Sequence, residues 1–316
     1  MPARRAGGKQ PDAVPGCQFA EVRVQDEAGA VPLPPRLPRG DDEDAHRPKP
    51  TLAVVVATRN RPALLAGLLT ALRAAVPDDT EIVVVDSAST TAETVDLCRR
   101  ERVRVERLEQ PGTSLARNHG VGCTTAEVIA FTDDDCLPAV GWGAALLRPF
   151  ADPSVGLVTG RVVADREVSA PVSVLDVAAP SDLLRGRVLG HGANAAVRRG
   201  AFGAVGGFDV RLGPGAPGRA SEDKDLFERL LAGGWHGRYE PAALVQHVQW
   251  RRPATALGLS FWYGFGQVRA GGRLRDAAWR EGVRAALRDL RAGYLTGAVA
   301  GLLRAAGALA GRPGRP

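Results

Sequence analysis

Three consecutive aspartates, Asp133, Asp134 and Asp135, follow an apolar run and precede a proline in the segment AFTDDDCLP. Carboxylates this close repel one another and resist removal from water. A divalent cation would offset the repulsion, because hard cations such as Mg²⁺ prefer carboxylate oxygens. In an extended segment the first and third side chains share a face, so we expect Asp133 and Asp135 to look into one site and Asp134 to look elsewhere. A solvated turn or a helix N-cap is the ordinary alternative, but a position directly after a buried strand favours the cation.

Two other acidic positions could take part in the same chemistry. Asp86 closes the apolar run EIVVVD, and Glu222 with Asp223 opens a helical pattern. A carboxylate that reaches an acceptor hydroxyl can act as a general base. The structural alternative for the pair is helix capping, with Ser221 as the N-cap and first-turn carboxylates favoured by the helix dipole.

Basic and polar side chains follow the first apolar run, in the segment ATRNRP. These residues are Thr58, Arg59, Asn60 and Arg61, and Arg117 and Asn118 lie near the start of a later helix. Arginine pairs well with phosphate, although such a segment can also be an ordinary turn with a basic face. The phosphate-loop pattern GxxxxGK[ST] is missing, and HGVGCT is a poor match to GxGxxG because it does not follow a strand.

Alternating strands and helices must position these residues. Continuous apolar or alternating runs predict strands at 51–57, 81–86, 103–108 and 127–135, and helical spacing predicts helices at 62–76, 91–101, 114–125 and 141–150. This alternation indicates a Rossmann-like, mostly parallel sheet flanked by helices. Ligands of such sheets bind beyond the carboxyl ends of the strands, so Asp86 and the three aspartates should share one crevice.

The second half of the chain follows a different pattern. We expect strands at 155–163 and 191–198, a helix at 222–234, a strand near 238–248 and helices from about 254 to 311. The glycine-rich loop at 213–218 is either a lid or a plain surface loop. The last apolar stretch is too short and interrupted for a membrane span, so it packs on the protein or makes peripheral membrane contact. Three tryptophans could stack on a ligand ring or pack in the core: Trp142, Trp235 and Trp262.

The composition is that of a soluble globular protein. Of 316 residues, 45% are hydrophobic and 24% are charged. The net charge of +6 comes almost entirely from scattered arginines. That distribution suits anionic ligands such as nucleotide diphosphates, and we expect no nucleic-acid partner. Four cysteines without metal spacing and an N-terminus without an apolar core predict a cytoplasmic protein, at the inner face of the membrane if it contacts one. Residues 1–50 are rich in proline and predict a flexible segment.

Seven motifs in order resemble the family-two inverting glycosyltransferases, which have the GT-A fold. They are VVVATRNRP, EIVVVDSAST, PGTSLARNHGV, VIAFTDDDCLP, GANAAVRRGAFGAVGGFD, SEDKDLFERLLAGGW and AALVQHV. The resemblance implies a transferase domain at 51–250 and a helical extension at 251–316. It also implies that a sugar moves from a nucleotide-diphosphate sugar to a hydroxyl acceptor, with inversion and with Mg²⁺ or Mn²⁺. The acceptor would be a glycan, a lipid-linked glycan or a small natural product.

The same resemblance implies roles for individual residues. Thr58, Arg61 and Asp86 would hold the donor nucleotide, together with Arg59, Asn60, Arg117, Asp133 and Asp134. Asp135 would bind the metal, and His247 matches a histidine near the metal or diphosphate, although an ordinary strand histidine is the alternative. Glu222 and Asp223 match the acidic pair that supplies the general base, and we favour Asp223. A nucleotidyltransferase or an inactive nucleotide-sugar-binding scaffold are the alternative functions.

Overall fold

The computed structural model describes residues 51–164, 190–248, 253–270, 272–291 and 295–311. The predicted flexible segment 1–50 lies outside these residues. Eight strands of the described chain form one sheet in the order β3-β2-β1-β4-β7-β6-β8-β5. The strands are β1 (Leu52–Thr58), β2 (Glu81–Ser87), β3 (Arg104–Leu108), β4 (Val128–Asp133), β5 (Cys136–Pro138), β6 (Val155–Ala164), β7 (Asn194–Arg198) and β8 (His236–His247).

The sheet is mixed but mostly parallel, as the sequence predicted. Strands β1 to β4 run parallel, and β6 pairs parallel with β8. Strand β7 is antiparallel to β4 and β6, and β5 is antiparallel to β8. Strand β1 is buried along its whole length because helices cover both faces of the sheet, which explains its continuous apolar run.

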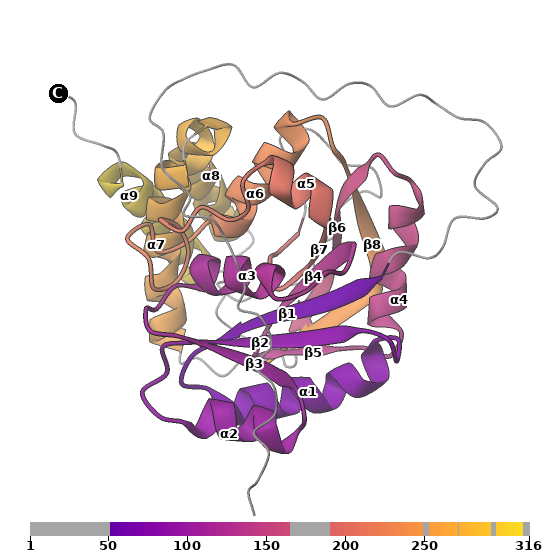
Figure 1. The fold of residues 1–316 in the computed structure, drawn as a ribbon. Coiled ribbons are helices and arrows are strands. Elements are labelled where there is room, and N and C mark those ends of the chain that lie inside the picture. Colours follow the sequence, from indigo (N-terminus) through magenta and orange to yellow (C-terminus); the bar gives the residue numbers. More distant parts are fainter. Residues whose placement is uncertain (1–50, 165–189, 249–252, 271, 292–294, 312–316) are drawn as a thin grey trace, which may run out of the picture.

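Helices form a layer on each face of the sheet (Figure 1). One layer holds α1 (Pro62–Ala75), α2 (Glu93–Arg100) and α4 (Trp142–Leu147). The other holds α3 (Thr113–Gly122), α5 (Arg199–Ala204) and α6 (Glu222–Ala232). Leucines spaced three or four residues apart make the buried face of α1, at Leu65, Leu68, Leu69 and Leu72. Trp142 belongs to the same core and donates from Nε1 to Asn194 Oδ1 at 2.8 Å, so it is a packing residue.

Three helices follow the sheet and lie beside α6: α7 (Pro253–Ala270), α8 (Gly272–Arg291) and α9 (Leu295–Ala310). They pack closely through glycines. A Cβ on Gly264 of α7 would lie 1.8 Å from the Arg304 carbonyl oxygen of α9. One on Gly282 of α8 would lie 2.6 Å from the Ala305 amide nitrogen and 2.8 Å from the Gly301 carbonyl oxygen. Among the described helices, none combines the length and the apolar character that crossing a bilayer requires.

Two local features differ from the prediction, and the loop at 213–218 makes a contact that the sequence did not indicate. The segment 133–135 is not extended: β4 ends at Asp133, and Asp134 and Asp135 form a turn before the short strand β5. Ser221 precedes α6 in a left-handed conformation with φ of 71° and makes no capping hydrogen bond through its side chain. The loop 213–218 is fixed against α3, where the Thr113 amide donates to the Pro214 carbonyl oxygen.

Candidate active site

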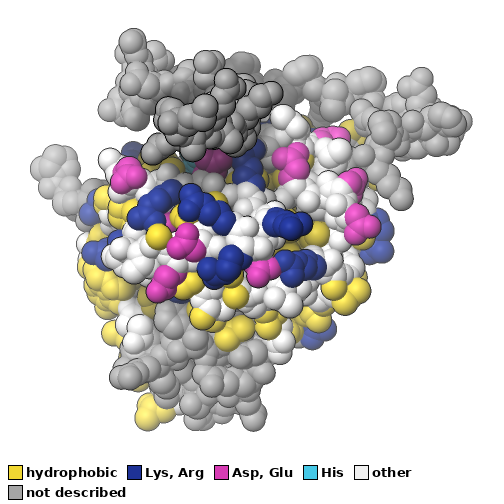
Figure 2. Space-filling model, turned by 60° about the horizontal axis from the view of Figure 1, so that its bottom comes forward, with side chains coloured by type: hydrophobic (Ala, Val, Ile, Leu, Met, Phe, Trp, Pro, Cys, Tyr) yellow, Lys and Arg dark blue, Asp and Glu magenta, His cyan; other side chains and the backbone are white. Residues whose placement is uncertain are grey.

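The carboxyl ends of β1, β2 and β4 bring the predicted site residues to one edge of the sheet. Thr58 lies beside Asp86 in the parallel pairing of β1 with β2, and Ala57 lies beside Asp133 in the pairing of β1 with β4. Residues far apart in sequence therefore meet at this edge. Basic and acidic side chains are interspersed on the face of the molecule drawn in Figure 2, as expected from the scattered arginines.

Asp134 is the inward member of the aspartate turn. Its side chain is fully buried, and Oδ2 accepts from the Thr58 hydroxyl at 2.6 Å and pairs with Arg61 Nε at 3.0 Å. Burial raises the pKa of Asp134 to about 7, although Arg61 and Thr58 favour the ionised form. Asp134 thus holds Thr58 and Arg61. It shares Arg61 with Asp135, whereas Asp133 pairs with Arg117, so the turn differs from the predicted arrangement in which Asp134 alone looks elsewhere.

Asp135 and His247 lie together at the other end of the turn. His247 Nε2 is 3.5 Å from Asp135 Oδ1, and Arg61 Nη1 is 3.3 Å from Asp135 Oδ2. The antiparallel pairing of β5 with β8 fixes this arrangement, because Cys136 is directly opposite His247. The ligand atoms of Asp135, Cys136 and His247 all lie within 4.8 Å of one another, so this buried group could hold a metal ion. Burial raises the pKa of the Cys136 thiol well above its ordinary value, which leaves Asp135 and His247 as the better ligands.

Arg117 of α3 connects the aspartate turn with the acidic pair of α6. Its guanidinium is buried and lies 2.8 Å from Asp133 Oδ1 and 3.2 Å from Glu222 Oε1. Burial opposes the charge of Arg117, but Asp133, Glu222 and Asp223 outweigh it and raise the pKa of Arg117. Burial likewise opposes the charge of Asp133, yet Arg117 and His247 prevail and lower the pKa of Asp133. These charges are interdependent, so the residues act as one network.

The two members of the acidic pair differ in their surroundings. Glu222 is buried, and burial followed by repulsion from Asp223 raises the pKa of Glu222 to about 7 despite Arg117. Asp223 is half-buried and accepts hydrogen bonds from the amides of Gly192 at 3.0 Å and Lys224 at 2.8 Å. Asp223 is therefore the more accessible carboxylate.

Sequence reasoning missed two residues of this network, His191 and Gly192. His191 lies close enough to Asp223 and Asp133 for their charges to act on it, but burial dominates and lowers the pKa of His191. A Cβ on Gly192 would lie 2.9 Å from Asp223 Cβ and 3.4 Å from Arg117 Nη1. The HGAN segment was interpreted as part of a strand and, from Gly192 on, as one of the seven family motifs, but neither interpretation gave His191 or Gly192 a role.

The remaining predicted donor residues join the loops after β1 and β2. Asn60 is left-handed with φ of 56°, and its Oδ1 accepts from the Thr90 amide at 2.8 Å. Arg59 Nε donates to the Ala88 carbonyl oxygen at 3.2 Å. The Asp86 carboxylate is fully buried, where it accepts from the Ser89 amide at 2.9 Å and pairs with Arg107 at 3.0 Å.

Asp86 therefore lies at the expected edge but faces inward, toward a partner that the sequence did not reveal. Arg107, on β3, also donates to the Ser89 carbonyl oxygen at 2.7 Å. Asn118 likewise faces the protein, where it donates to the Phe208 carbonyl oxygen at 2.8 Å. Both residues shape the loops of the crevice through backbone contacts.

Comparison with known proteins identifies the family. Residues 53–204 match the model of glycosyl transferase family 2. Two Mycobacterium tuberculosis proteins, from strains CDC 1551 / Oshkosh and ATCC 25618 / H37Rv, are both named pre-mycofactocin glycosyltransferase and are 35% identical over 226 residues, which is 67% of this chain. The chain belongs to glycosyl transferase family 2. It spans 44% of the length of these two relatives.

A solved mannosyltransferase structure shows the same fold. The mannosyltransferase PcManGT from Pyrobaculum calidifontis, determined in complex with GDP-Man and Mn²⁺, matches with a TM-score of 0.53 and 21% identity over 84% of this chain and 75% of that chain. The predicted GT-A fold is confirmed by this match. The motifs that carried the family resemblance include the aspartate turn, which lies within the matched residues 53–204.

Proposed function

We propose that this protein transfers a sugar from a nucleotide-diphosphate sugar to a hydroxyl acceptor, with inversion at the anomeric carbon. The observation that carries the proposal is Arg117, which binds Asp133 on one side and Glu222 on the other. This bridge joins the donor end of the crevice to the acidic pair. A nucleotidyltransferase would not need a carboxylate pair at that position, so the geometry favours sugar transfer.

Asp135 and His247 would hold the divalent cation. A carboxylate and an imidazole that already lie 3.5 Å apart in a buried group suit Mg²⁺ or Mn²⁺ beside a diphosphate. Such a cation, when bound, neutralises charge on the leaving diphosphate. PcManGT was determined with Mn²⁺ and GDP-Man, which supports the use of a divalent cation together with a nucleotide sugar.

The loops after β1 and β2 would bind the nucleotide. Arg61 contacts Asp134 and Asp135, so its guanidinium stands next to the proposed position of the diphosphate. Thr58, Arg59, Asn60 and Asp86 would shape the pocket through the contacts between the two loops. Asp134 would act through Thr58 and Arg61 because its own side chain is not exposed.

Asp223 would be the general base. It is half-buried and held by the Gly192 and Lys224 amides, whereas Glu222 is engaged by Arg117. In the proposed step Asp223 takes the proton of the acceptor hydroxyl while the hydroxyl oxygen forms a bond to the anomeric carbon and the bond to the diphosphate breaks. Glu222 would keep Arg117 in place.

Donor-dependent stabilisation and turnover test this proposal. A nucleotide sugar that binds the native state raises the melting temperature, and we expect that shift to require Mn²⁺. GDP-Man is the first donor to test and pre-mycofactocin the first acceptor, because the similar proteins carry these names. Asp223→Asn should abolish transfer and keep the donor shift. Retained transfer would remove Asp223 from its role, and donor binding without turnover on any acceptor would favour an inactive scaffold.

Peripheral membrane contact through the C-terminal helices belongs to the same proposal. Six apolar side chains on α8 and α9 are exposed: Leu287, Leu290, Leu295, Val299, Leu302 and Leu309. Arg284 and Arg291 are exposed on the same hairpin and would favour an anionic surface. Co-sedimentation with phosphatidylglycerol vesicles should fall at least about tenfold when Leu302 and Leu309 are both changed to Gln. Unchanged sedimentation would contradict the contact.

A further inference from the structure

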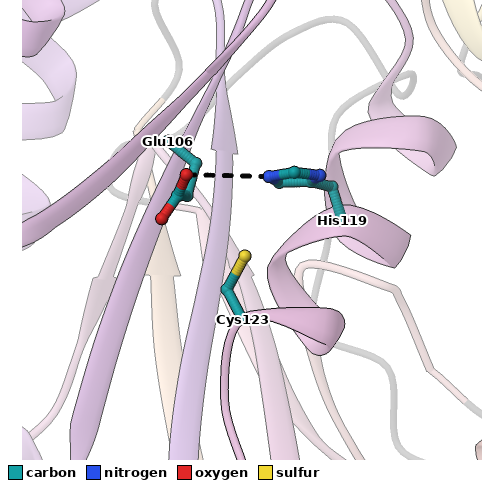
Figure 3. A group of neighbouring side chains, drawn as sticks. All are labelled: Glu106, His119 and Cys123. Carbon is teal, nitrogen blue, oxygen red and sulfur yellow. Dashed lines mark ion pairs between the residues drawn. The ribbon is translucent and has the colours of Figure 1, made fainter. Parts of the chain in front are cut away.

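A second group of metal-ligand side chains lies away from the proposed donor site. Glu106 comes from the edge strand β3, and His119 and Cys123 come from the end of α3 (Figure 3). Their spacing of four residues places His119 and Cys123 on one face of the helix. At 100° per residue, that face is opposite the one that carries Arg117. The group is therefore separate from the aspartate turn.

The three ligand atoms are already close together. The Glu106 carboxylate, the His119 ring and the Cys123 thiol lie within 4.8 Å of one another, and Figure 3 shows the thiol pointing toward the gap between the other two. Glu106 Oε2 is 3.8 Å from His119 Nε2, which is too long for a direct hydrogen bond. Two such atoms bound to one tetrahedral zinc ion lie about 3.4 Å apart, so a small closure would suffice.

Arg104 positions this group through two hydrogen bonds. Its Nε donates to Glu106 Oε1 at 3.0 Å, and its Nη1 donates to the Cys123 carbonyl oxygen at 2.5 Å. One arginine thus orients the carboxylate, whose Oε2 faces His119, and fixes the backbone of the cysteine. Ligating carboxylates in metal sites are usually held in this way by a neighbouring donor.

We propose that Glu106, His119 and Cys123 form a Zn²⁺ site with a fourth position open to solvent. Thiolate, imidazole and carboxylate together suit zinc better than Mg²⁺ or Mn²⁺. The Glu106 and His119 side chains are each 31% exposed and Cys123 is buried, so an ion enters from the solvent side and meets the thiol at the bottom. The thiol releases its proton to solvent on binding. The ion would tie the edge strand to α3, and this site does not depend on the proposed transferase function.

Cobalt substitution of the metal-stripped full-length chain tests the site. Every protein in this test carries Asp135→Asn. This change removes the donor-site aspartate, so that the donor site does not add to the number of Co²⁺ ions bound. We expect one equivalent of Co²⁺ to bind with near-ultraviolet thiolate-to-cobalt absorption. Cys123→Ser should abolish this absorption, and Cys98→Ala and Cys136→Ser should keep it. Absorption that survives in Cys123→Ser, or that is lost in Cys136→Ser, would overturn the proposal.

A second variant keeps the test valid if Cys123→Ser does not fold. His119→Gln changes a partly exposed side chain, so we expect a folded protein whose Zn²⁺ affinity, measured by competition with a chromophoric chelator, is about 10–100-fold lower. Zn²⁺ should raise the melting temperature of the parent protein and not that of His119→Gln. Equal Zn²⁺ affinity in the two proteins would exclude His119 as a ligand and refute the site.

Discussion

Gly192 is the residue whose small size matters most to the acidic pair. An alanine there would place Cβ 2.9 Å from Asp223 Cβ and 3.4 Å from Arg117 Nη1, so Asp223 must shift. We expect Gly192→Ala to lower kcat at least about tenfold, because small misplacements of a catalytic group are costly. Gly203→Ala is the control, since its Cβ would meet no atom within 4 Å. Equal kcat in the two variants would show that the contact with Gly192 does not position Asp223.

Glu222 should make the stability of the protein depend on pH. Its pKa rises from 4.5 to about 7 in the folded state, mainly through burial, so folding favours the protonated form. Its stabilising contribution is then complete below about pH 4.5 and is lost as the pH rises through about 7. We expect the free energy of unfolding to fall by ~3 kcal/mol over this window because of Glu222. Urea titrations at pH 5 and pH 8 should show a smaller difference for Glu222→Gln, and an unchanged difference would contradict the assignment.

At the scale of single residues, the sequence reveals which side chains are chemically suited to a site better than it reveals where those side chains point. The three aspartates and the acidic pair were visible as carboxylates at element ends. Nothing in the sequence showed that Asp86 turns inward to Arg107, or that Asp134 is buried against Thr58 and Arg61. Such pairings depend on the register of neighbouring strands and on turn geometry, which composition and spacing leave open.

Helix α3 carries Arg117 and the proposed zinc ligand His119, Cys123 follows it directly, and Gly120 sets the distance of the helix from the sheet. A Cβ on Gly120 would lie 2.4 Å from Val55 Cγ1 of β1 and 3.1 Å from Val85 Cγ2 of β2. We expect Gly120→Ala to lower the free energy of unfolding by about 1–3 kcal/mol through overpacking, measured in urea. Gly200→Ala on α5, which meets no atom within 4 Å, should be neutral or stabilising. Equal stability of both variants would mean that α3 can move away from the sheet without lowering the free energy of unfolding.

The elements themselves were largely predictable. Long apolar runs gave β1, β2 and β4, and leucine spacing gave α1. Two short elements, β5 and α5, were missed because three to six residues carry too little periodicity. The turn at Asp134 and Asp135 was missed for a related reason: it leads into β5, whose pairing partner β8 lies more than a hundred residues later.

At the scale of the whole molecule, the sequence predicted the α/β fold and a helical extension after residue 250, but no motif indicated where the extension packs. Its position follows from glycine contacts. We propose that the extension helps to position the acidic pair of the 51–250 domain. Gly266 of α7 would place a Cβ 2.6 Å from the Ala220 carbonyl oxygen, and the Arg219 guanidinium lies 4.8 Å from the centre of the Trp262 ring. Helix α7 therefore supports the loop that leads directly into Glu222 and Asp223.

This contact predicts that a change far from the donor site affects turnover. Gly266→Ala should displace α7 from the loop at 218–220 and, through it, Asp223, so we expect kcat to fall about tenfold or more. The Mn²⁺-dependent melting shift with GDP-Man should stay the same, because Asp135 lies in the turn between β4 and β5 and His247 lies at the end of β8. Gly258→Ala on the same helix, with no atom within 4 Å of its Cβ, is the matched control. If Gly266→Ala keeps the kcat of the control, the extension does not position the acidic pair; if it loses the donor shift as well, its effect is on the fold of the whole domain.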